Sequence, residues 1–306
     1  MTPFLYLGTT VFFWGTQYWA IEIAAEHASA VMITALRAAL AAVLLVVAVP
    51  VFGARFPARA LWPWAAVTGL LVVALTLGGI SEGAARAGAG NAAVLVNSAP
   101  FVIVVLGRLF LGERISLSAA AGLVLGFTGV VLIVSPQLGA GGDVGDLALG
   151  MGLALASAVG FAVGALMVKA KTDRDPELDL VGLTAAQYVV GGAVLSVLAF
   201  ALEPVDSTDW GSGDLWGAIV WISIGGSAIA FLTFFAALRR MPANSAAPWL
   251  FLVPVIAVIV DAGRGKLPSA VVVTGMALAV VGVALVNLPA GTLERRLRLA
   301  RPRPPR

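Results

Sequence analysis

The sequence predicts an all-α polytopic membrane protein with ten transmembrane helices, arranged as two inverted five-helix repeats. Three observations predict this fold. Of the 306 residues, 60% are apolar, only 11% are charged, and the mean hydropathy is +1.00, whereas a soluble domain carries about 25% charged residues. Apolar runs long enough to cross a bilayer recur along the chain. The second half of the chain also repeats a pattern of the first.

Each apolar run has the length that a helix needs to span a bilayer, about 20 residues. In order, the predicted spans cover residues 3–24, 31–52, 61–80, 88–110, 115–135, 146–169, 182–203, 215–237, 243–261 and 268–288. Turn and charge residues separate them. The first span is not a secretory signal peptide, because no cationic region precedes it and because it contains Trp14 and Gln17.

The distribution of Lys and Arg predicts the orientation in the membrane. With the N-terminus placed inside, the inner segments hold nine cations in the loops and six in the tail. The outer segments then hold only Arg86, Arg264 and Lys266. We therefore expect an integral protein of a bacterial-type inner (plasma) membrane with both termini cytoplasmic. Residues 291–306 form an Arg- and Pro-rich cytoplasmic tail in this prediction.

Two stretches about 153 residues apart read alike, one from Ala89 and one from Ala243. The matched pairs are Pro100 and Pro254, Gly112 and Gly265, Gly122 and Gly275, and Gly129 and Gly282. This predicts a first five-helix repeat over 1–140 and a second over 141–290. An odd number of helices per repeat inverts the second copy in the membrane, which is typical of transporters with a site near the midplane. Accidental likeness between Ala-, Val- and Gly-rich helices is the alternative.

This pattern resembles the drug/metabolite transporter superfamily and, within it, the EamA-type exporters. The residues that carry the resemblance are Pro100, the Leu111-Gly112-Glu113-Arg114 motif and the Gly122…Gly129 spacing, and the likeness runs from Trp14-Gly15 to Asn287. The second copy departs at Lys266, where the family often has Glu. The resemblance implies export of small metabolites by alternating access through a central cavity. Within the family, the aromatic-rich lining of the predicted cavity resembles that of the exporters of aromatic and neutral amino acids.

The first span carries Trp14, Tyr18 and Glu22 on one helical stripe, with Gln17 beside them. Trp and Tyr offer flat apolar faces and a hydrogen-bonding atom, which suit an aromatic or zwitterionic substrate. The alternative is an aromatic belt at the headgroups. We predict that Trp14, Gln17 and Tyr18 contact the substrate.

The fourth and ninth spans begin with polar residues and carry a central proline. A proline in a membrane helix frees a backbone carbonyl and bends the helix. Static kinks, with Asn joining neighbouring helices, are the alternative. The predicted substrate contacts are Asn91, Asn97, Asn244 and Trp249, and the predicted hinges are Pro100 and Pro254.

Arg37 falls within the second span, where a lone arginine costs about 2.5–3.5 kcal/mol or more. We predict that it binds substrate and that Glu22 or Glu82 is its ion-pair partner or a coupling acid. Snorkelling of Arg37 to the interface is the alternative. The equivalent position in the second repeat is Gln187, beside Tyr188. Both are predicted substrate contacts.

Composition also excludes several kinds of site. The chain has no cysteine and one histidine, so we expect no metal, no cofactor and no catalytic residue. Six of the 19 cations lie in the tail and the rest of the chain is close to neutral, so nucleic acid is not an expected partner. The expected partners are a small-molecule substrate and membrane lipid, with a monomer favoured and a dimer as the alternative.

Three other functions remain as alternatives. An exporter or facilitator of other amphipathic metabolites or drugs has the same features. Nucleotide-sugar transport is less favoured, because a diphosphate needs several buried cations. A remote alternative is an intramembrane prenyltransferase-like enzyme. The acidic segment 173–179 resembles half of its magnesium site, but no second inner cluster exists.

Overall fold

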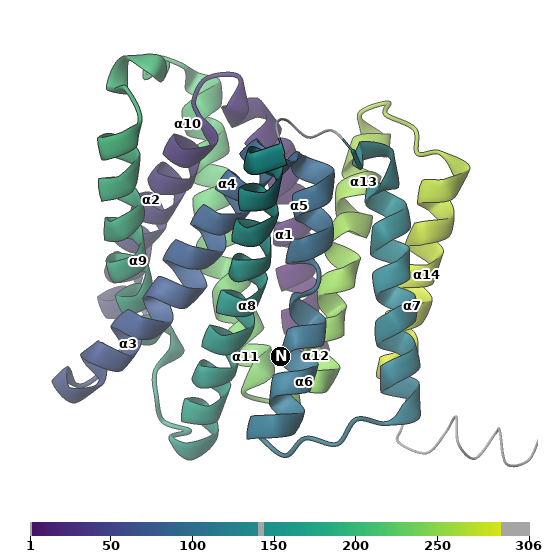
Figure 1. Cartoon of the computed structure of the whole chain (residues 1–306). Helices are drawn as coiled ribbons and strands as arrows, with labels where there is room; N and C mark the ends of the chain where they lie inside the picture. The colour runs from purple at the N-terminus through teal and green to yellow at the C-terminus, as the bar shows by residue number, and fades with distance from the viewer. Residues whose placement is uncertain (1, 140–143, 289–306) are drawn as a thin grey trace, which may run out of the picture.

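The computed structural model describes residues 2–139 and 144–288, which form a bundle of helices (Figure 1). These residues contain no strand. The predicted all-α polytopic fold is confirmed. The predicted tail, and the predicted boundary between the repeats at 140–141, lie outside the described residues.

The first part of the bundle contains the helices that precede the 140–143 connection. These are α1 (Pro3–Ala25), α2 (Ala30–Val51), α3 (Trp62–Gly69), α4 (Thr76–Ala87), α5 (Ala89–Val96), α6 (Ala99–Phe110) and α7 (Leu117–Val134). The second part follows the connection. It contains α8 (Val144–Arg174), α9 (Leu180–Leu202), α10 (Gly213–Trp221), α11 (Ala230–Leu238), α12 (Ala243–Ala246), α13 (Val253–Gly263) and α14 (Ala270–Val286).

Several of these helices join end to end into longer rods. A π-helical segment, η2 (Leu70–Leu75), joins α3 to α4, and a second, η5 (Ile222–Ile229), joins α10 to α11. A 3₁₀ segment, η6 (Ala247–Leu252), joins α12 to α13. The remaining 3₁₀ turns are η1 (Arg59–Leu61), η3 (Ser135–Gln137) and η4 (Val205–Ser207).

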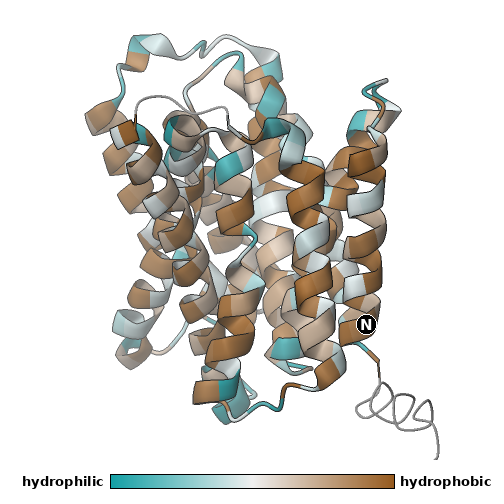
Figure 2. Ribbon diagram, turned by 45° about the vertical axis from the view of Figure 1, so that its right-hand side comes forward, coloured by the Kyte–Doolittle hydropathy of each residue, from teal (hydrophilic) through white to brown (hydrophobic). Residues whose placement is uncertain are grey.

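Eight rods in the described residues are long and apolar enough to span a bilayer, and α14 is a shorter apolar helix. With α1, which is 23 residues long, they fall on the ten predicted ranges. Apolar residues cover the rods and hydrophilic residues gather at their ends (Figure 2). The third rod runs over 59–87, beyond the predicted 61–80. Its last turns carry Glu82 and Arg86, which pair with one another and so allow a helix to continue through polar sequence.

Local signals recur at matching positions of the two parts. Ser116 caps α7 by accepting a hydrogen bond from the Ala119 amide, and Ser269 caps α14 in the same way from Val272. Gly112 and Gly265 both adopt positive φ, at 68° and 88°, in the turns that precede these caps. The two π-helical segments also occupy equivalent rods.

The helices α7 and α14 pack through reciprocal glycine contacts. A Cβ on Gly129 would lie 2.5 Å from the Gly275 carbonyl oxygen, and one on Gly275 would lie 2.6 Å from that of Gly129. Gly122 and Gly282 approach each other equally closely. Such small residues let two backbones meet in a membrane. This interface is a closely packed seam between the two parts of the chain.

Elsewhere, helices of the first part pack directly on helices of the second part. Helix α2 packs on α9, α4 packs on α8, and α11 packs on α1. We call the end of the bundle where α1 begins and α14 ends the lower end, as drawn in Figure 1. There α6 packs on α12 and η6, while no comparable packing joins α5 to α13 at the upper end. The rods that carry the central prolines therefore pack most extensively at the lower end, and Ala93 and Val94 of α5 share only one small apolar cluster with Val255 and Val258 of α13 among the described residues.

Candidate functional site

The centre of the candidate site is Arg37 of α2, which is 6% exposed. Its Nη2 donates to Gln17 Oε1 of α1 at 2.9 Å, and its Nε donates to Ser227 Oγ of η5 at 3.2 Å. Both partners are neutral. Three rods thus meet at one buried cation.

A cluster of aromatic rings lies next to this cation. Trp14, at the middle of α1, donates from Nε1 to the Gly226 carbonyl oxygen at 2.8 Å. Its ring meets Phe231 edge-on with a centroid distance of 5.2 Å and meets Phe161 at 5.8 Å. The Gly226 carbonyl is part of η5, and π-helical turns of this kind frequently occur at functional sites.

Two tyrosines lie close enough to Arg37 to experience its charge, Tyr18 and Tyr188. The Tyr18 side chain is 46% exposed although it adjoins a buried arginine. Tyr188 is fully buried, and its ring meets Phe231 edge-on at 5.7 Å. The Tyr188 hydroxyl lies near Ser227, yet it makes no well-formed hydrogen bond within the described residues. The structure therefore brings together five sequence-predicted residues, which we call the Arg37 cluster: Trp14, Gln17, Tyr18, Arg37 and Tyr188.

Gln187 faces a different neighbour. Its Nε2 donates to Thr68 Oγ1 of α3 at 2.9 Å, and its backbone lies so close to α3 that a Cβ on Gly69 would be 2.6 Å from the Gln187 carbonyl oxygen. Gln187 therefore holds α9 against α3. It does not share the contacts of Arg37, its counterpart in the first repeat.

The predicted asparagine and Trp249 positions lie apart from one another. Asn91 accepts from the Gly139 amide at the upper end, and Asn97 donates to the Ala93 carbonyl within its own helix. Asn244 donates to the Arg114 carbonyl at the lower end. Trp249 lies 5.8 Å from Phe4, near the start of α1. None of these contacts reaches the Arg37 cluster.

Both predicted hinge prolines are buried where a rod is interrupted. Pro100 occupies the first turn of α6, after the break that separates α5 from α6. Pro254 occupies the first turn of α13, directly after η6. The first turn of a helix tolerates proline because its amide has no helical partner there. The prolines thus mark the points at which each rod changes direction.

The acids predicted as partners of Arg37 bind other cations. Glu22 accepts from Arg264 and from Lys266, both at 2.6 Å, and the Glu22 hydrogen bond raises the pKa of Arg264. Glu82 accepts from Arg86 at 2.9 Å, and Arg86 also pairs with Asp146. The structure therefore corrects the expected pairing: Arg37 has amide and hydroxyl partners in place of a carboxylate.

Glu113, of the Leu-Gly-Glu-Arg motif, joins the two parts at the lower end. Its carboxylate accepts from the backbone amides of Ala243 and Asn244 at 2.7 and 2.8 Å. These amides begin α12 and have no partner within the helix. We call this contact the lower clasp. Lys266, at the equivalent place in the second part, cannot accept hydrogen bonds and instead pairs with Glu22.

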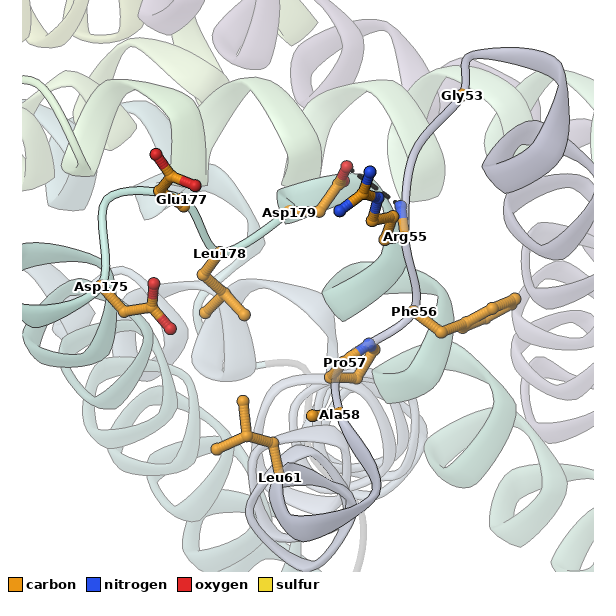
Figure 3. Close-up of a pocket in the computed structure, with 10 residues that line it drawn as sticks. All are labelled: Gly53, Arg55, Phe56, Pro57, Ala58, Leu61, Asp175, Glu177, Leu178 and Asp179. Atoms are coloured by element: carbon orange, nitrogen blue, oxygen red, sulfur yellow. Dashed lines mark hydrogen bonds between the residues drawn. The ribbon is translucent and has the colours of Figure 1, made fainter.

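A cavity of about 470 Å³ also lies at the lower end, and none of the residues that line it belongs to the Arg37 cluster. Figure 3 shows the residues that line it. Its walls are the connection between α2 and α3 and the connection between α8 and α9. Asp179 accepts from the Arg55 amide at 3.2 Å and closes one side. The described residues contain no group of three His, Cys, Asp or Glu that could hold a metal ion.

Sequence reasoning missed Ser227, Gly226 and the Phe161, Phe231 and Phe234 rings. Ser227 is fully buried and contacts Arg37 from a position 190 residues away. A signal was present, because Gly225-Gly226-Ser227 interrupts an otherwise apolar span. The rings gave no comparable signal, since aromatic residues are common in apolar spans.

Comparisons with known proteins agree with this architecture. A model of the EamA-like transporter family matches residues 1–135 and 148–288. An uncharacterised transporter of Bacillus subtilis, YvbV, is 27% identical over 92% of this chain and 90% of its own. A probable terminal-alkyne amino-acid exporter of Streptantibioticus cattleyicolor is 27% identical over 96% of this chain and 95% of its own. One solved crystal structure superposes with a TM-score of 0.81 at 23% identity, covering 96% of this chain and 97% of that chain.

Proposed function

The chain belongs to the EamA-like transporter family, and from this premise we propose that it exports aromatic or neutral amino acids. The protein is an integral membrane transporter of this type. Export proceeds by alternating access to a site around Arg37, and the two parts of the chain act as inverted five-helix repeats.

One observation carries the choice of substrate: a buried arginine with only neutral partners lies beside a cluster of aromatic rings. A guanidinium is permanently charged and matches a carboxylate in geometry. The rings of Trp14 and Phe231 provide an apolar surface for a side chain. The amino-acid exporter among the relatives supports the same substrate class.

The contrast between the two ends supports alternating access. At the lower end the lower clasp and the packing of α6 on α12 join the proline-bearing rods, which pack less extensively at the upper end. In the inverted-repeat proposal, the opposite state arises when α5 and α13 meet and α6 and α12 separate. Pro100 and Pro254 lie where each rod would bend.

The distribution of charge supports a cytoplasmic lower end. Nine described cations lie on loops or helix ends there: Arg55, Arg59, Arg108, Arg114, Lys169, Lys171, Arg174, Arg239 and Arg240. Arg86, Arg264 and Lys266 lie at the upper end. By the positive-inside rule the N-terminus is then cytoplasmic, and in this proposal the joined lower end corresponds to an outward-facing state of a monomeric carrier in an inner membrane.

Counterflow in proteoliposomes tests the proposed function. Vesicles are loaded with unlabelled L-phenylalanine, and uptake of labelled L-phenylalanine is followed with and without a pH gradient. We expect saturable counterflow, its loss in Arg37→Ala, and its retention in Arg86→Ala, in which the changed arginine lies in an exposed ion pair. A pH gradient that changes the initial rate indicates proton coupling, and an unchanged rate indicates a facilitator.

Two outcomes contradict the proposal. One is the absence of counterflow for every member of a panel of aromatic and neutral amino acids. The other is full counterflow in Arg37→Ala at wild-type expression, which removes Arg37 from the site.

A further inference from the structure

The immediate surroundings of Arg37 offer hydrogen-bond donors without a carboxylate to receive them. Arg37 is buried, and of its nitrogens Nε and Nη2 bind Ser227 and Gln17. Within the described ranges 2–139 and 144–288, no ion pair includes Arg37. Buried charges in proteins are normally paired, because an unpaired one is costly to remove from water.

Tyr188 adds a second donor at the same place. Its side chain is fully buried, and its hydroxyl lies near Ser227 and Arg37 without a hydrogen bond of good geometry in the described residues. A phenolic hydroxyl buried in this way loses its hydrogen bond to water and gains no well-formed one from the described residues. The guanidinium and the hydroxyl are therefore arranged to bind one acceptor group.

The acids near the site bind elsewhere. Glu22 binds Arg264 and Lys266, and Glu82 binds Arg86. A substrate ammonium would therefore meet aromatic rings and neutral groups beside Arg37. The donors at the site require a ligand with a hydrogen-bond acceptor. No described carboxylate beside Arg37 would require the ligand to carry an ammonium group.

We infer that Arg37 and the Tyr188 hydroxyl form a carboxylate subsite, and that the carboxylate, not the ammonium, is the group the substrate must carry. This inference rests on the proposed function and deepens it. A carboxylate offers two oxygens to a planar guanidinium and a neighbouring hydroxyl. It takes over donors of Arg37 that Gln17 and Ser227 hold here, and the apolar body of the ligand lies against the Phe231 and Trp14 rings. The substrate class is thus amphipathic monocarboxylates, of which amino acids are members.

Calorimetric binding to the purified full-length chain in nanodiscs tests this inference. Four probes are titrated: 3-phenylpropionate, L-phenylalanine, phenethylamine and inorganic phosphate. We expect both carboxylates to bind with Kd values within about tenfold of each other, and phenethylamine and phosphate not to bind. Arg37→Gln is expected to weaken 3-phenylpropionate binding at least roughly thirtyfold, and Tyr188→Phe roughly tenfold.

Tyr6→Phe is the matched control for Tyr188→Phe, because Tyr6 lies under the Arg240 guanidinium, away from Arg37. Its binding is expected to equal that of the wild type. Thermal unfolding without ligand checks that each variant is folded. If Arg37→Gln does not fold, Arg37→Lys replaces it, because lysine keeps the charge and lacks the planar guanidinium. Arg37→Lys is expected to bind 3-phenylpropionate at least roughly tenfold more weakly than the wild type.

Any of the following binding results overturns the inference: binding of phenethylamine as tight as that of 3-phenylpropionate, binding of phosphate in place of the carboxylates, or wild-type binding in folded Arg37→Gln. Its failure differs from failure of the proposed function. Counterflow of L-phenylalanine without binding of 3-phenylpropionate sinks the inference alone. Binding of 3-phenylpropionate through Arg37 without amino-acid counterflow sinks the amino-acid export proposal alone.

Discussion

Arg37 donates to the amide oxygen of Gln17 at 2.9 Å, so the charge in the interior of the bundle is held between α2 and α1 by a neutral side chain. A neutral acceptor orients the guanidinium without cancelling its charge. The cation thus remains available to an anionic group that enters beside it. This arrangement is expected to affect both the stability of the protein and its binding of substrate.

The buried charge lowers the free energy of unfolding. We expect Arg37→Met to raise the free energy of unfolding of the substrate-free protein by roughly 1–3 kcal/mol, because a buried cation without a carboxylate partner is replaced by an apolar side chain of similar length. Denaturant unfolding in detergent measures the change. Arg86→Met is the comparison, because Arg86 has two carboxylate partners and its loss brings no such gain. A lower stability of Arg37→Met than of the wild type contradicts this account.

The orientation of Arg37 depends on Gly226. A Cβ at Gly226 would lie 2.5 Å from Gln17 Oε1 and 3.3 Å from Arg37 Nη2. We expect Gly226→Ala to displace the Gln17 amide, so that Arg37 is no longer held in position before the substrate enters, and to raise the KM for counterflow roughly tenfold. Gly217→Ala is the control in the same rod, since a Cβ there meets nothing within 4 Å. Equal KM values in the two variants would show that Gln17 does not position Arg37.

The seam between α7 and α14 sets thermal stability in a similar way. A methyl group at Gly129 would lie 2.5 Å from two backbone atoms of α14. We expect Gly129→Ala to lose about 1–3 kcal/mol through overpacking, seen as a lower Tm in a detergent melting assay. Gly152→Ala, on an open face of α8, is expected to leave the Tm unchanged or slightly higher. A Tm of Gly129→Ala equal to that of Gly152→Ala would refute the close packing.

The lower clasp holds the lower end closed. Glu113→Ala removes two hydrogen bonds from the start of α12, a loss of about 1–2 kcal/mol. Because the chain has no cysteine, a single cysteine at Ala243, which is buried and whose amide donates to Glu113, reports on this end directly. We expect faster alkylation of that cysteine, by a reagent added on the side of the lower end, in the Glu113→Ala background. Glu177→Ala, which removes an equal charge from the nearby connection, is expected to leave the rate unchanged, and a rate that Glu113→Ala leaves unchanged would exclude the clasp.

Much of the fold could be predicted from the sequence, because apolar runs of the required length predict spans directly. The predicted 31–52 and 182–203 match α2 and α9 within two residues. The π-helical segments could not be predicted. They depend on contacts between distant helices, such as the approach of Gly191 to the Gly69 carbonyl oxygen, and local sequence does not contain that information.

Some residues of the candidate site could likewise be predicted from the sequence, and others could not. Trp14, Gln17 and Tyr18 could be grouped because helical periodicity places them on one side of α1. The partner of Arg37 was predicted as an acid because charge pairing is the usual solution in a membrane. Ser227 could not be identified as that partner, since it lies on a rod of the second part and a long side chain has several neighbours within reach. Asn91 and Asn244 contact loops at opposite ends, which spacing along one rod does not reveal.

The central claim is that the two ends of the proline-bearing rods open in alternation, and spin-label distances test it most directly. One labelled pair, Ala89→Cys with Gly263→Cys, spans the upper end, and a second, Phe110→Cys with Pro242→Cys, spans the lower end. In nanodiscs, addition of saturating L-phenylalanine is predicted to populate a state in which the upper distance is shorter and the lower distance is longer. Distances that both stay constant, or that change in the same direction, would contradict alternating access in this protein.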